Sequence, residues 1–356
     1  GMYRRKIIKM QKFAPYKQIS AFLLLILIFF FYLCNNQTYQ IMNSNLKSFC
    51  IFIIYVFGAI ACFAFFQFCY PYHLYYQEQN QLFLASWDYL TTYLEKPGWL
   101  ACMAGDFLTQ FYLYHYMGAT ILTLCILLAG YNIKYAVRDA GFKGTWAPNI
   151  AAFAVMTLLV CFSLDYEYRL SSILAIAGGA SVFRVSTTIL ASTRKFINKI
   201  ETMDENNPTL HRMGLPIWIS TFSITISIFV CHWFFGYGVW IYGALVFIGS
   251  LENIMKAGCY YCLTTLVITF FLLMLCKRLY FCDFQTIYTY PGIGKLVKPQ
   301  LDQERTLAVD CEYYFGNYNR VVNMVEKDKN PNQYMKFYHD LIMAQFRSQP
   351  ASLKKY

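Results

Sequence analysis

Long stretches without a charged side chain constrain this chain more than any other feature of its sequence. Residues 48–71 contain no Asp, Glu, Lys or Arg, and residues 19–33 form a shorter, intensely apolar run. A helix needs roughly 20 apolar residues to cross the hydrocarbon core of a bilayer, whereas barrel strands alternate apolar and polar residues. The sequence therefore predicts an all-α, polytopic membrane protein. It excludes a cytosolic enzyme, a secreted disulfide scaffold and an outer-membrane barrel.

Eight stretches are candidate spans, and we expect about 7–8 transmembrane helices. They are residues 19–33, 48–71, 107–131, 147–164, 170–193, 216–235, 238–256 and 257–276. Basic residues flank the first stretch and follow the last, and each group favours the inner side. Whether residues 19–33 and 238–256 cross fully is therefore left open, and with it the side on which the C-terminal tail lies.

Composition and charge narrow the class of partner. Only 14% of the residues are charged, whereas a soluble domain carries about a quarter. Six basic residues and no acid precede residue 18, which is typical of a flank facing lipid headgroups. The net charge of +11 therefore indicates a bilayer partner, and we expect no nucleic acid.

Most of the 13 cysteines lie in apolar runs, where cysteine behaves as a small hydrophobic residue. Cys259 and Cys262 form one CxxC motif. A zinc site needs four ligands, and no second CxxC or HxxxH motif supplies the other two. We therefore expect neither a metal site nor a cofactor.

Loop charges predict the topology of the central helices. Loops 70–106 and 165–169 are acidic and are expected outside, whereas loops 132–146 and 194–212 are basic and are expected inside. This alternation agrees with a multi-pass membrane protein.

We divide the chain into four parts. Residues 1–41 form a basic N-terminal segment with a short apolar helix, which is either a retained anchor or an extension before a natural start at Met42. Residues 42–282 form the transmembrane domain, residues 283–302 a linker and residues 303–356 a helical tail.

The outer loop, residues 72–106, supplies the first candidate site residues. Aromatic and apolar residues recur there at helical spacing and predict one interfacial helix over 72–98. Asp88 and Glu95 share a face of that helix, and Glu78 lies elsewhere. Asp88 and Glu78 are candidate catalytic residues, as a general base or metal ligand for a lipid-linked substrate. The alternative is that they belong to the solvated face of the helix.

Three further residues are candidate substrate-binding groups. Asp106 and Gln110 share a face at i, i+4 near the entry of a span, although Asp106 also fits a helix N-cap. Arg184 interrupts an apolar stretch and could bind a phosphate or anionic headgroup. Its alternative role is a buried partner of Asp106 or Glu252.

Glycines within the spans predict close packing and a turn. Gly178 and Gly179, followed by Ala180 and Ser181, form a small-residue patch that favours close helix approach. The sequence Gly236-Tyr237-Gly238 marks a turn or a re-entrant break.

The tail has the pattern of a helical hairpin. Residues 303–325 are helical in pattern but are interrupted around Gly316, and residues 333–346 form another helix after the Asn-Pro-Asn at 330–332. The run from Tyr313 to Phe346 is similar to tetratricopeptide repeats. Because such solenoids need about three repeats, we expect the tail either to pack on the membrane domain or to be the truncated start of a longer array.

The chain resembles a family of uncharacterised multi-spanning inner-membrane proteins of Bacteroidetes with tetratricopeptide-like tails. The resemblance rests on the order of a basic lead, one span and then the run YYQEQNQLFLASWDYLTTYLEKPGWL–GDFLTQFY. The resemblance covers residues 42–356 and is most specific over 70–118. A looser similarity is to polytopic glycosyltransferases that use lipid-phosphate sugars. Those enzymes place acidic residues in their first outer loop, and the similarity implies that Asp88 and Glu78 are the corresponding residues here.

Three hypotheses of function follow. The first is an envelope enzyme acting on a lipid-linked, glycosyl substrate, with Arg184 as phosphate partner if it faces the same cavity. The second is a non-enzymatic scaffold or assembly protein that recruits a protein partner through its tail. The third is a transporter, which the absence of an internal repeat disfavours.

Overall fold

The computed structural model describes residues 44–81, 83–142, 144, 146–201, 211–257, 267–275, 296–328 and 330–346. Within these ranges every regular element is helical and no strand occurs, which confirms the all-α prediction there. The chain divides into two units, residues 1–71 and 72–356, and each is described by itself. Residues 19–33, the first expected span, lie outside the described residues.

The described part of the first unit is one apolar helix. It comprises α4 (Ser44–Ala64) and a π-helical turn, η1 (Phe65–Cys69), and it ends where the Tyr70 N–H donates to the Phe65 carbonyl oxygen, 3.1 Å away. Residues Phe49–Cys69 are long and apolar enough to cross a membrane. The span expected over 48–71 is therefore confirmed as a candidate membrane helix.

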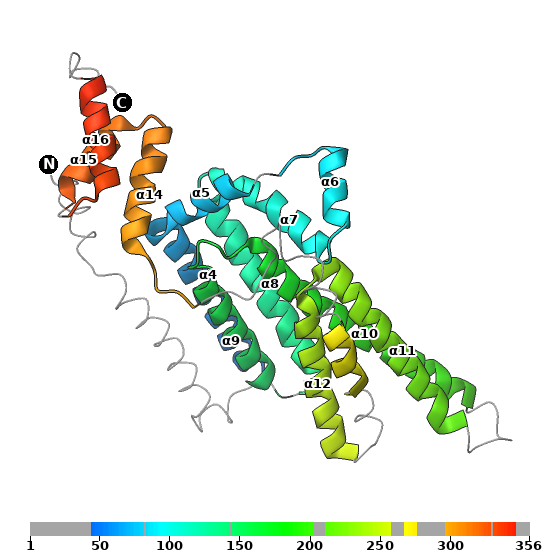
Figure 1. Cartoon of the computed structure of the whole chain (residues 1–356). Helices are drawn as coiled ribbons and strands as arrows, with labels where there is room; N and C mark the ends of the chain where they lie inside the picture. The colour runs from blue at the N-terminus through cyan, green and yellow to red at the C-terminus, as the bar shows by residue number, and fades with distance from the viewer. Residues whose placement is uncertain are drawn as a thin grey trace. The chain divides into compact units, whose positions relative to one another are not determined.

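The second unit contains the remaining apolar helices (Figure 1). They are α8 (Met117–Asp139), α9 (Trp146–Phe162), α10 (Leu170–Glu201), α11 (His211–Phe235), α12 (Gly238–Ala257) and helical residues 267–275. Among the described residues, two stretches of this unit reach the length and hydropathy of a membrane span, Met117–Asp139 and Leu170–Ser192. Trp146–Phe162, Phe222–Phe235 and Gly238–Ser250 are shorter apolar helices.

The expected start of the second long span, residue 107, is wrong. Helix α7 (Trp99–Thr109) ends in a 3₁₀ turn, η2 (Gln110–Leu113), and α8 begins only at Met117. Tyr116 has a positive φ of 67°, a left-handed conformation that breaks the helix. Apolar and aromatic residues surround this break, so hydropathy gives no sign of it.

The single interfacial helix expected over 72–98 is also wrong, because two short helices occupy this segment. Helix α5 (Pro71–Asn80) and helix α6 (Trp87–Leu94) are separated by a non-helical stretch. Ser86 starts α6 as its N-cap, with its hydroxyl oxygen accepting from the Tyr89 N–H at 3.4 Å.

Glycines allow α10 to pack closely against the α11–α12 turn. A Cβ added at Gly179 would lie 2.1 Å from the Gly238 carbonyl oxygen, and one added at Gly178 would lie 2.0 Å from the Phe235 ring. Gly236 has a φ of 51°, which L side chains rarely adopt. Both the close-packing patch and the turn are therefore confirmed.

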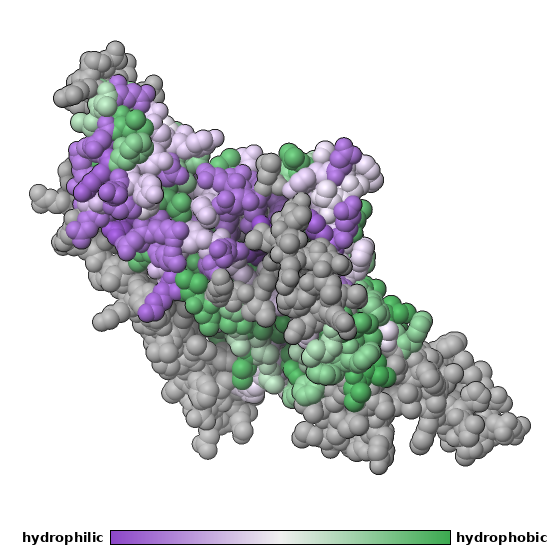
Figure 2. Space-filling view, in the orientation of Figure 1, coloured by the Kyte–Doolittle hydropathy of each residue, from purple (hydrophilic) through white to green (hydrophobic). Residues whose placement is uncertain are grey.

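The tail is a three-helix unit, with α14 (Leu301–Tyr314), α15 (Tyr318–Lys327) and α16 (Gln333–Gln345). Val309, Val321 and Ile342 are fully buried in its core. Gly316, with a φ of 75°, forms the turn between α14 and α15. The expected interruption at Gly316 and the final helix are thus confirmed. Figure 2 shows hydrophilic residues over the tail, α5 and α6, and hydrophobic residues over the apolar helices of the second unit.

Candidate functional site

Asp106, the last residue of the outer loop, lies in a buried polar cluster between α6 and α7. Its α7 neighbour Gly105 lies so close to α10 that an added Cβ would be 2.7 Å from the Ser171 backbone. Asp106 is 9% exposed, and the Tyr93 hydroxyl donates to its Oδ2 at 2.8 Å. The Tyr89 and Tyr93 hydroxyl oxygens lie 3.3 Å apart, which extends the contact along α6.

Burial dominates the electrostatics of this cluster. Desolvation raises the pKa of Asp106, while the Tyr93 hydrogen bond and the charges of Arg169 and Lys96 act in the opposite direction. Burial and the Asp106 contact also raise the pKa of Tyr93. A carboxyl group of raised pKa beside a phenol can take up or release a proton, so Asp106 has the environment of an acid–base group.

The other four predicted site residues are Gln110, Glu78, Asp88 and Arg184, and none of them is the hydrogen-bond partner of the Asp106 carboxylate among the described residues. Gln110 donates through Nε2 to the Gln81 carbonyl oxygen at 3.1 Å, which ties the end of α7 to the loop after α5. Glu78 is half-buried on α5, and burial raises its pKa. Asp88 is exposed in the first turn of α6, where a carboxylate complements the helix dipole.

Arg184 belongs to the far end of the helices rather than to this cluster. Its Nη1 donates to Asn132 Oδ1 at 3.2 Å, and its Nε lies 3.6 Å from Asp139 Oδ2. Asp106 as its partner is therefore a wrong prediction, and the side chain of Glu252 lies outside the described residues. Asp106 is beside Ser171, 13 residues before Arg184, which is about 20 Å along α10.

The tail docks on the outer loop through two buried acids that were not predicted. Glu304 of α14 is 6% exposed, and its Oε1 accepts from the backbone N–H groups of Tyr72 at 2.6 Å and His73 at 3.3 Å. Its Oε2 accepts from the Tyr166 hydroxyl at 3.2 Å. Because Tyr72 and His73 begin α5, Glu304 caps the N-terminus of that helix.

A second acid completes the docking contact. Glu312 Oε1 accepts from the Tyr72 hydroxyl at 2.8 Å and forms an ion pair with Arg320 at 2.8 Å. Its Oε2 accepts from Asn317 Nδ2 at 2.7 Å, so both carboxylate oxygens are used. We call Glu304, Glu312, Tyr72, His73 and Tyr166 the docking cluster.

Burial sets the protonation of the docking cluster. It raises the pKa of Glu304 to about 7, against the hydrogen bonds from Tyr72, Tyr166 and His73. It lowers the pKa of His73 to about 3, so this ring is neutral, and it lies 4.5 Å from the Tyr166 ring. The docking contact thus combines a titrating carboxyl group with a neutral imidazole.

The position of Glu304 and Glu312 on α14 is the sequence feature that could have revealed them. Ala308 and Cys311, at i+4 and i+7 from Glu304, are buried, and Glu312 follows at i+8. Acids on the apolar stripe of a helix need partners, and these partners lie about 230 residues away in the sequence.

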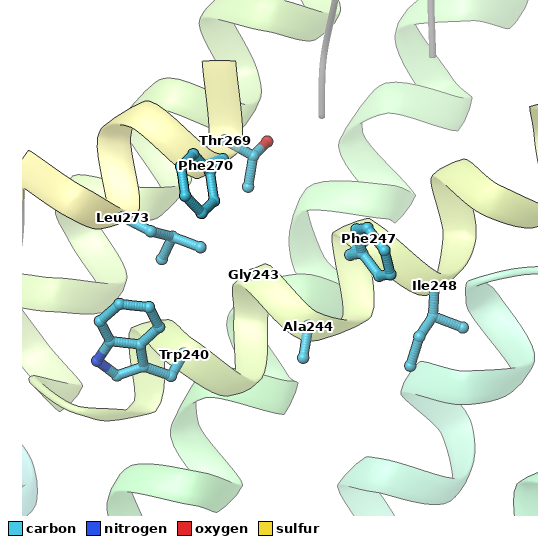
Figure 3. A pocket seen from close by; sticks show the side chains of 8 residues that line it. All are labelled: Trp240, Gly243, Ala244, Phe247, Ile248, Thr269, Phe270 and Leu273. Carbon is cyan, nitrogen blue, oxygen red and sulfur yellow. The ribbon is translucent and has the colours of Figure 1, made fainter. Parts of the chain in front are cut away.

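An apolar cavity of about 360 Å³ lies between α12 and helical residues 267–275 (Figure 3). Its lining residues are Trp240, Gly243, Ala244, Phe247, Ile248, Thr269, Phe270 and Leu273. None of them titrates near neutral pH, so the lining supplies no acid–base group.

The described residues contain no group of three or more His, Cys, Asp or Glu side chains placed to hold a metal ion. Cys259 and Cys262, the CxxC motif, lie outside the described residues.

Comparison with known proteins gives a family but no function. Residues 16–350 match the Family of unknown function (DUF6057), a range that begins ahead of Met42 and includes most of the chain. Neither a curated protein nor a solved structure matches. The chain therefore belongs to the family of unknown function DUF6057.

Proposed function

We propose that this chain is a multi-pass bacterial inner-membrane protein that holds its helical tail at the outer face of the membrane and presents it to a protein partner. The observation that carries this proposal is the docking cluster, in which Glu304 caps α5 and Glu312 binds Tyr72. The contacted segments, α5 and the loop at residues 163–169, are those whose charges favour the outer side.

A tail at the outer face requires an even number of crossings between the outer loop and the tail. In the proposed topology, α8 to α12 cross the membrane five times and residues 257–276 cross it a sixth time. This topology requires 238–256 to cross fully, one of the two alternatives left open by the loop charges. It also agrees with about 7–8 transmembrane helices once α4 and residues 19–33 are included.

Exposed aromatic residues on the tail support a partner-binding role. Tyr334 is 70% exposed and Phe337 is 58% exposed, one turn apart on α16, while the opposite face of α16 packs into the tail core through Met335 and Ile342. Aromatic residues of this kind are enriched at protein interfaces. The tetratricopeptide-like pattern favours the same role.

Thiol labelling in intact cells tests the topology. Asp340→Cys places a thiol at an exposed position of α16, and Gly144→Cys places one in the loop expected inside, where an added Cβ meets no atom within 4 Å. A membrane-impermeant reagent should label Asp340→Cys in intact cells and Gly144→Cys only after permeabilisation. Protection of Asp340→Cys in intact cells, with labelling after permeabilisation, would refute the outer tail.

Partner recruitment needs a separate test. Tyr334→Ser with Phe337→Ser should abolish co-purification of a bound protein while leaving the labelling pattern of the tail unchanged. The matched control is Lys336→Ser, an exposed position between them on the same helix. Unchanged co-purification by the double variant would refute recruitment through this face.

A second candidate is an envelope enzyme for a lipid-linked substrate, with Asp106 rather than Asp88 or Glu78 as the acid–base group. The observation in its favour is the buried Asp106–Tyr93 pair. Asp106→Asn should then remove activity without reducing the amount of folded protein, whereas Asp88→Asn should not. No feature of the described residues adds to the third hypothesis, a transporter.

A further inference from the structure

Arg184 forms the centre of a cationic and aromatic cluster between α8 and α10. Its guanidinium carbon lies 4.9 Å from the centre of the Tyr135 ring and 5.7 Å from that of Tyr131. Its Nη1 donates to Asn132, while its buried Nε has no hydrogen-bond partner among the described residues. An arginine has five N–H donors in a planar fork, so this side chain retains donor capacity in a fixed orientation.

A second cation shares the same ring. Lys134 Nζ lies 5.8 Å from the centre of the Tyr135 ring, and Arg138 is exposed one helical turn beyond Lys134. Asp139, 3.6 Å from Arg184, supplies one negative charge beside these three positive charges. We call Lys134, Arg138 and Arg184, with Tyr131 and Tyr135, the basic cluster.

Helix geometry places the basic cluster at the end of the bundle opposite the docked tail. Asn132 is 15 residues after the start of α8, and Arg184 is 14 residues after the start of α10, so side by side they lie at the same depth, about 21 Å along each helix. Asp139 is about 33 Å from the start of α8, close to the full thickness of a hydrocarbon core. The long Arg and Lys side chains therefore reach the headgroup region of that leaflet.

The charge of the two helices is unbalanced at this end. The sequences of α8 and α10 contain six cations, Lys134, Arg138, Arg184, Arg194, Lys195 and Lys199, and two acids, Asp139 and Glu201. Seven of them lie in the half of each helix that is farther from the docked tail, and Arg184 lies close to the middle of α10.

We propose that the basic cluster binds the phosphate group of an anionic membrane lipid in the leaflet opposite the docked tail. Basic pockets between transmembrane helices bind such headgroups, and a guanidinium matches two phosphate oxygens. Tyr131 is 51% exposed and lies beside the guanidinium, where its ring can contact the glycerol and upper acyl chains. This site goes beyond the proposed function, since it depends on neither the tail nor Asp106.

Lipid binding by the purified full chain tests the proposal. Native mass spectrometry from a neutral detergent would give apparent Kd values for phosphatidylglycerol and for phosphatidylcholine. Phosphatidylglycerol should bind at least tenfold more tightly. Each cation near a membrane surface contributes about a fivefold change in affinity, so Lys134→Gln with Arg138→Gln should weaken phosphatidylglycerol binding by about 25-fold.

Two further variants separate lipid binding from folding. Arg184→Lys keeps the charge and the Asp139 partner but loses the fork, and it should also weaken phosphatidylglycerol binding. Lys298→Gln removes one exposed charge far along the chain and should change nothing. Equal affinity for the two lipids, or an unchanged Kd for the Lys134, Arg138 double variant, would overturn the proposal. Displacement of the lipid by an equal concentration of inorganic phosphate would overturn a lipid as the occupant.

Discussion

Replacing Glu304 by glutamine should remove a pH dependence from tail docking. The docked carboxyl group has a pKa of about 7, and a solvated Glu has a pKa of about 4.5. A pKa that is higher in the docked state means that docking favours the protonated form. The stabilisation is therefore fully present below about pH 4.5 and is lost as the pH rises through about 7. A glutamine side chain at this position would keep the acceptor oxygen for Tyr72 and His73 without titrating.

The size of the effect follows from the pKa difference. A pKa difference of about 2.5 at about 1.4 kcal/mol per pKa unit corresponds to about 3.5 kcal/mol in full. About 3 kcal/mol of this, or about two orders of magnitude in the docking equilibrium, falls between pH 4.5 and 8. A neighbouring group titrates too. His73, with a pKa of about 3, opposes the trend as the pH falls below about 6.5. Comparison of the wild type with Glu304→Gln at the same pH cancels this contribution.

Cys311 provides the assay, because it is 2% exposed on α14 and directly precedes Glu312 of the docking cluster. Its alkylation by a thiol reagent, followed by mass spectrometry of its peptide, reports release of the tail. The ratio of the wild-type rate to the Glu304→Gln rate should rise by about two orders of magnitude between pH 4.5 and 8. A ratio that stays constant over that range would refute the reasoning.

Two other variants test the packing and the buried polar pair. Gly179→Ala should lower the amount of folded protein, because the added methyl group would lie 2.1 Å from the Gly238 carbonyl oxygen and such overpacking costs roughly 1–3 kcal/mol or more. The control is Gly58→Ala, where a Cβ meets nothing within 4 Å, and it should leave thermal unfolding of the purified protein unchanged. Equal behaviour of the two variants would count against close packing. Tyr93→Phe should destabilise the protein by about 1–3 kcal/mol at neutral pH, because Asp106 loses its phenol donor. This loss of stability should shrink at acidic pH, where the carboxyl group is neutral. A loss of stability that does not depend on pH would mean that Asp106 is already protonated at pH 7.

Much of the helical framework could be predicted from the sequence. Hydropathy located α9 and α12 to within two residues, because apolar side chains surround most of these helices. It missed the polar ends of other helices, since α10 extends to Glu201, eight residues past its expected end, and α11 begins at His211, five residues before its expected start. Gly178 and Gly179 could be assigned to close packing because a missing side chain is directly visible in sequence. Gly316 could be assigned to the tail turn for the same reason.

The breaks within aromatic segments could not be predicted. Tyr116 adopts a left-handed conformation, which a glycine at this position would have indicated in the sequence. The stretch between Asn80 and Trp87 contains neither Gly nor Pro, so the sequence gives no sign of that break either. Hydropathy averages over such a stretch, whereas the backbone responds to Ser86 as a local cap. Helical boundaries in the outer loop therefore depend on local backbone geometry that hydropathy does not detect.

The candidate site was only partly accessible to sequence reasoning. Asp106 was identified because a carboxylate beside an apolar run is unusual, and the structure gives it Tyr93 as a partner. The docking cluster and the Arg184 partner were not identified, because both depend on contacts between segments distant in sequence. Charge at membrane depth can be read from one sequence, but the identity of its partner requires the packing of the helices.

The arrangement of charges argues for the scaffold over the enzyme. Three of the four carboxylate oxygens of Glu304 and Glu312 accept the hydrogen bonds that hold the tail, and three of these four bonds come from Tyr72 and His73 at the start of α5. The fourth oxygen accepts from Asn317 within the tail. The phosphate-binding side chain that an enzyme for a lipid-linked substrate requires, Arg184, lies about 20 Å along α10 from Asp106. The two groups of a single catalytic centre would have to act across most of the hydrocarbon core. A docked tail with exposed Tyr334 and Phe337 needs no such cooperation, and loss of the tail contact alone should then remove function.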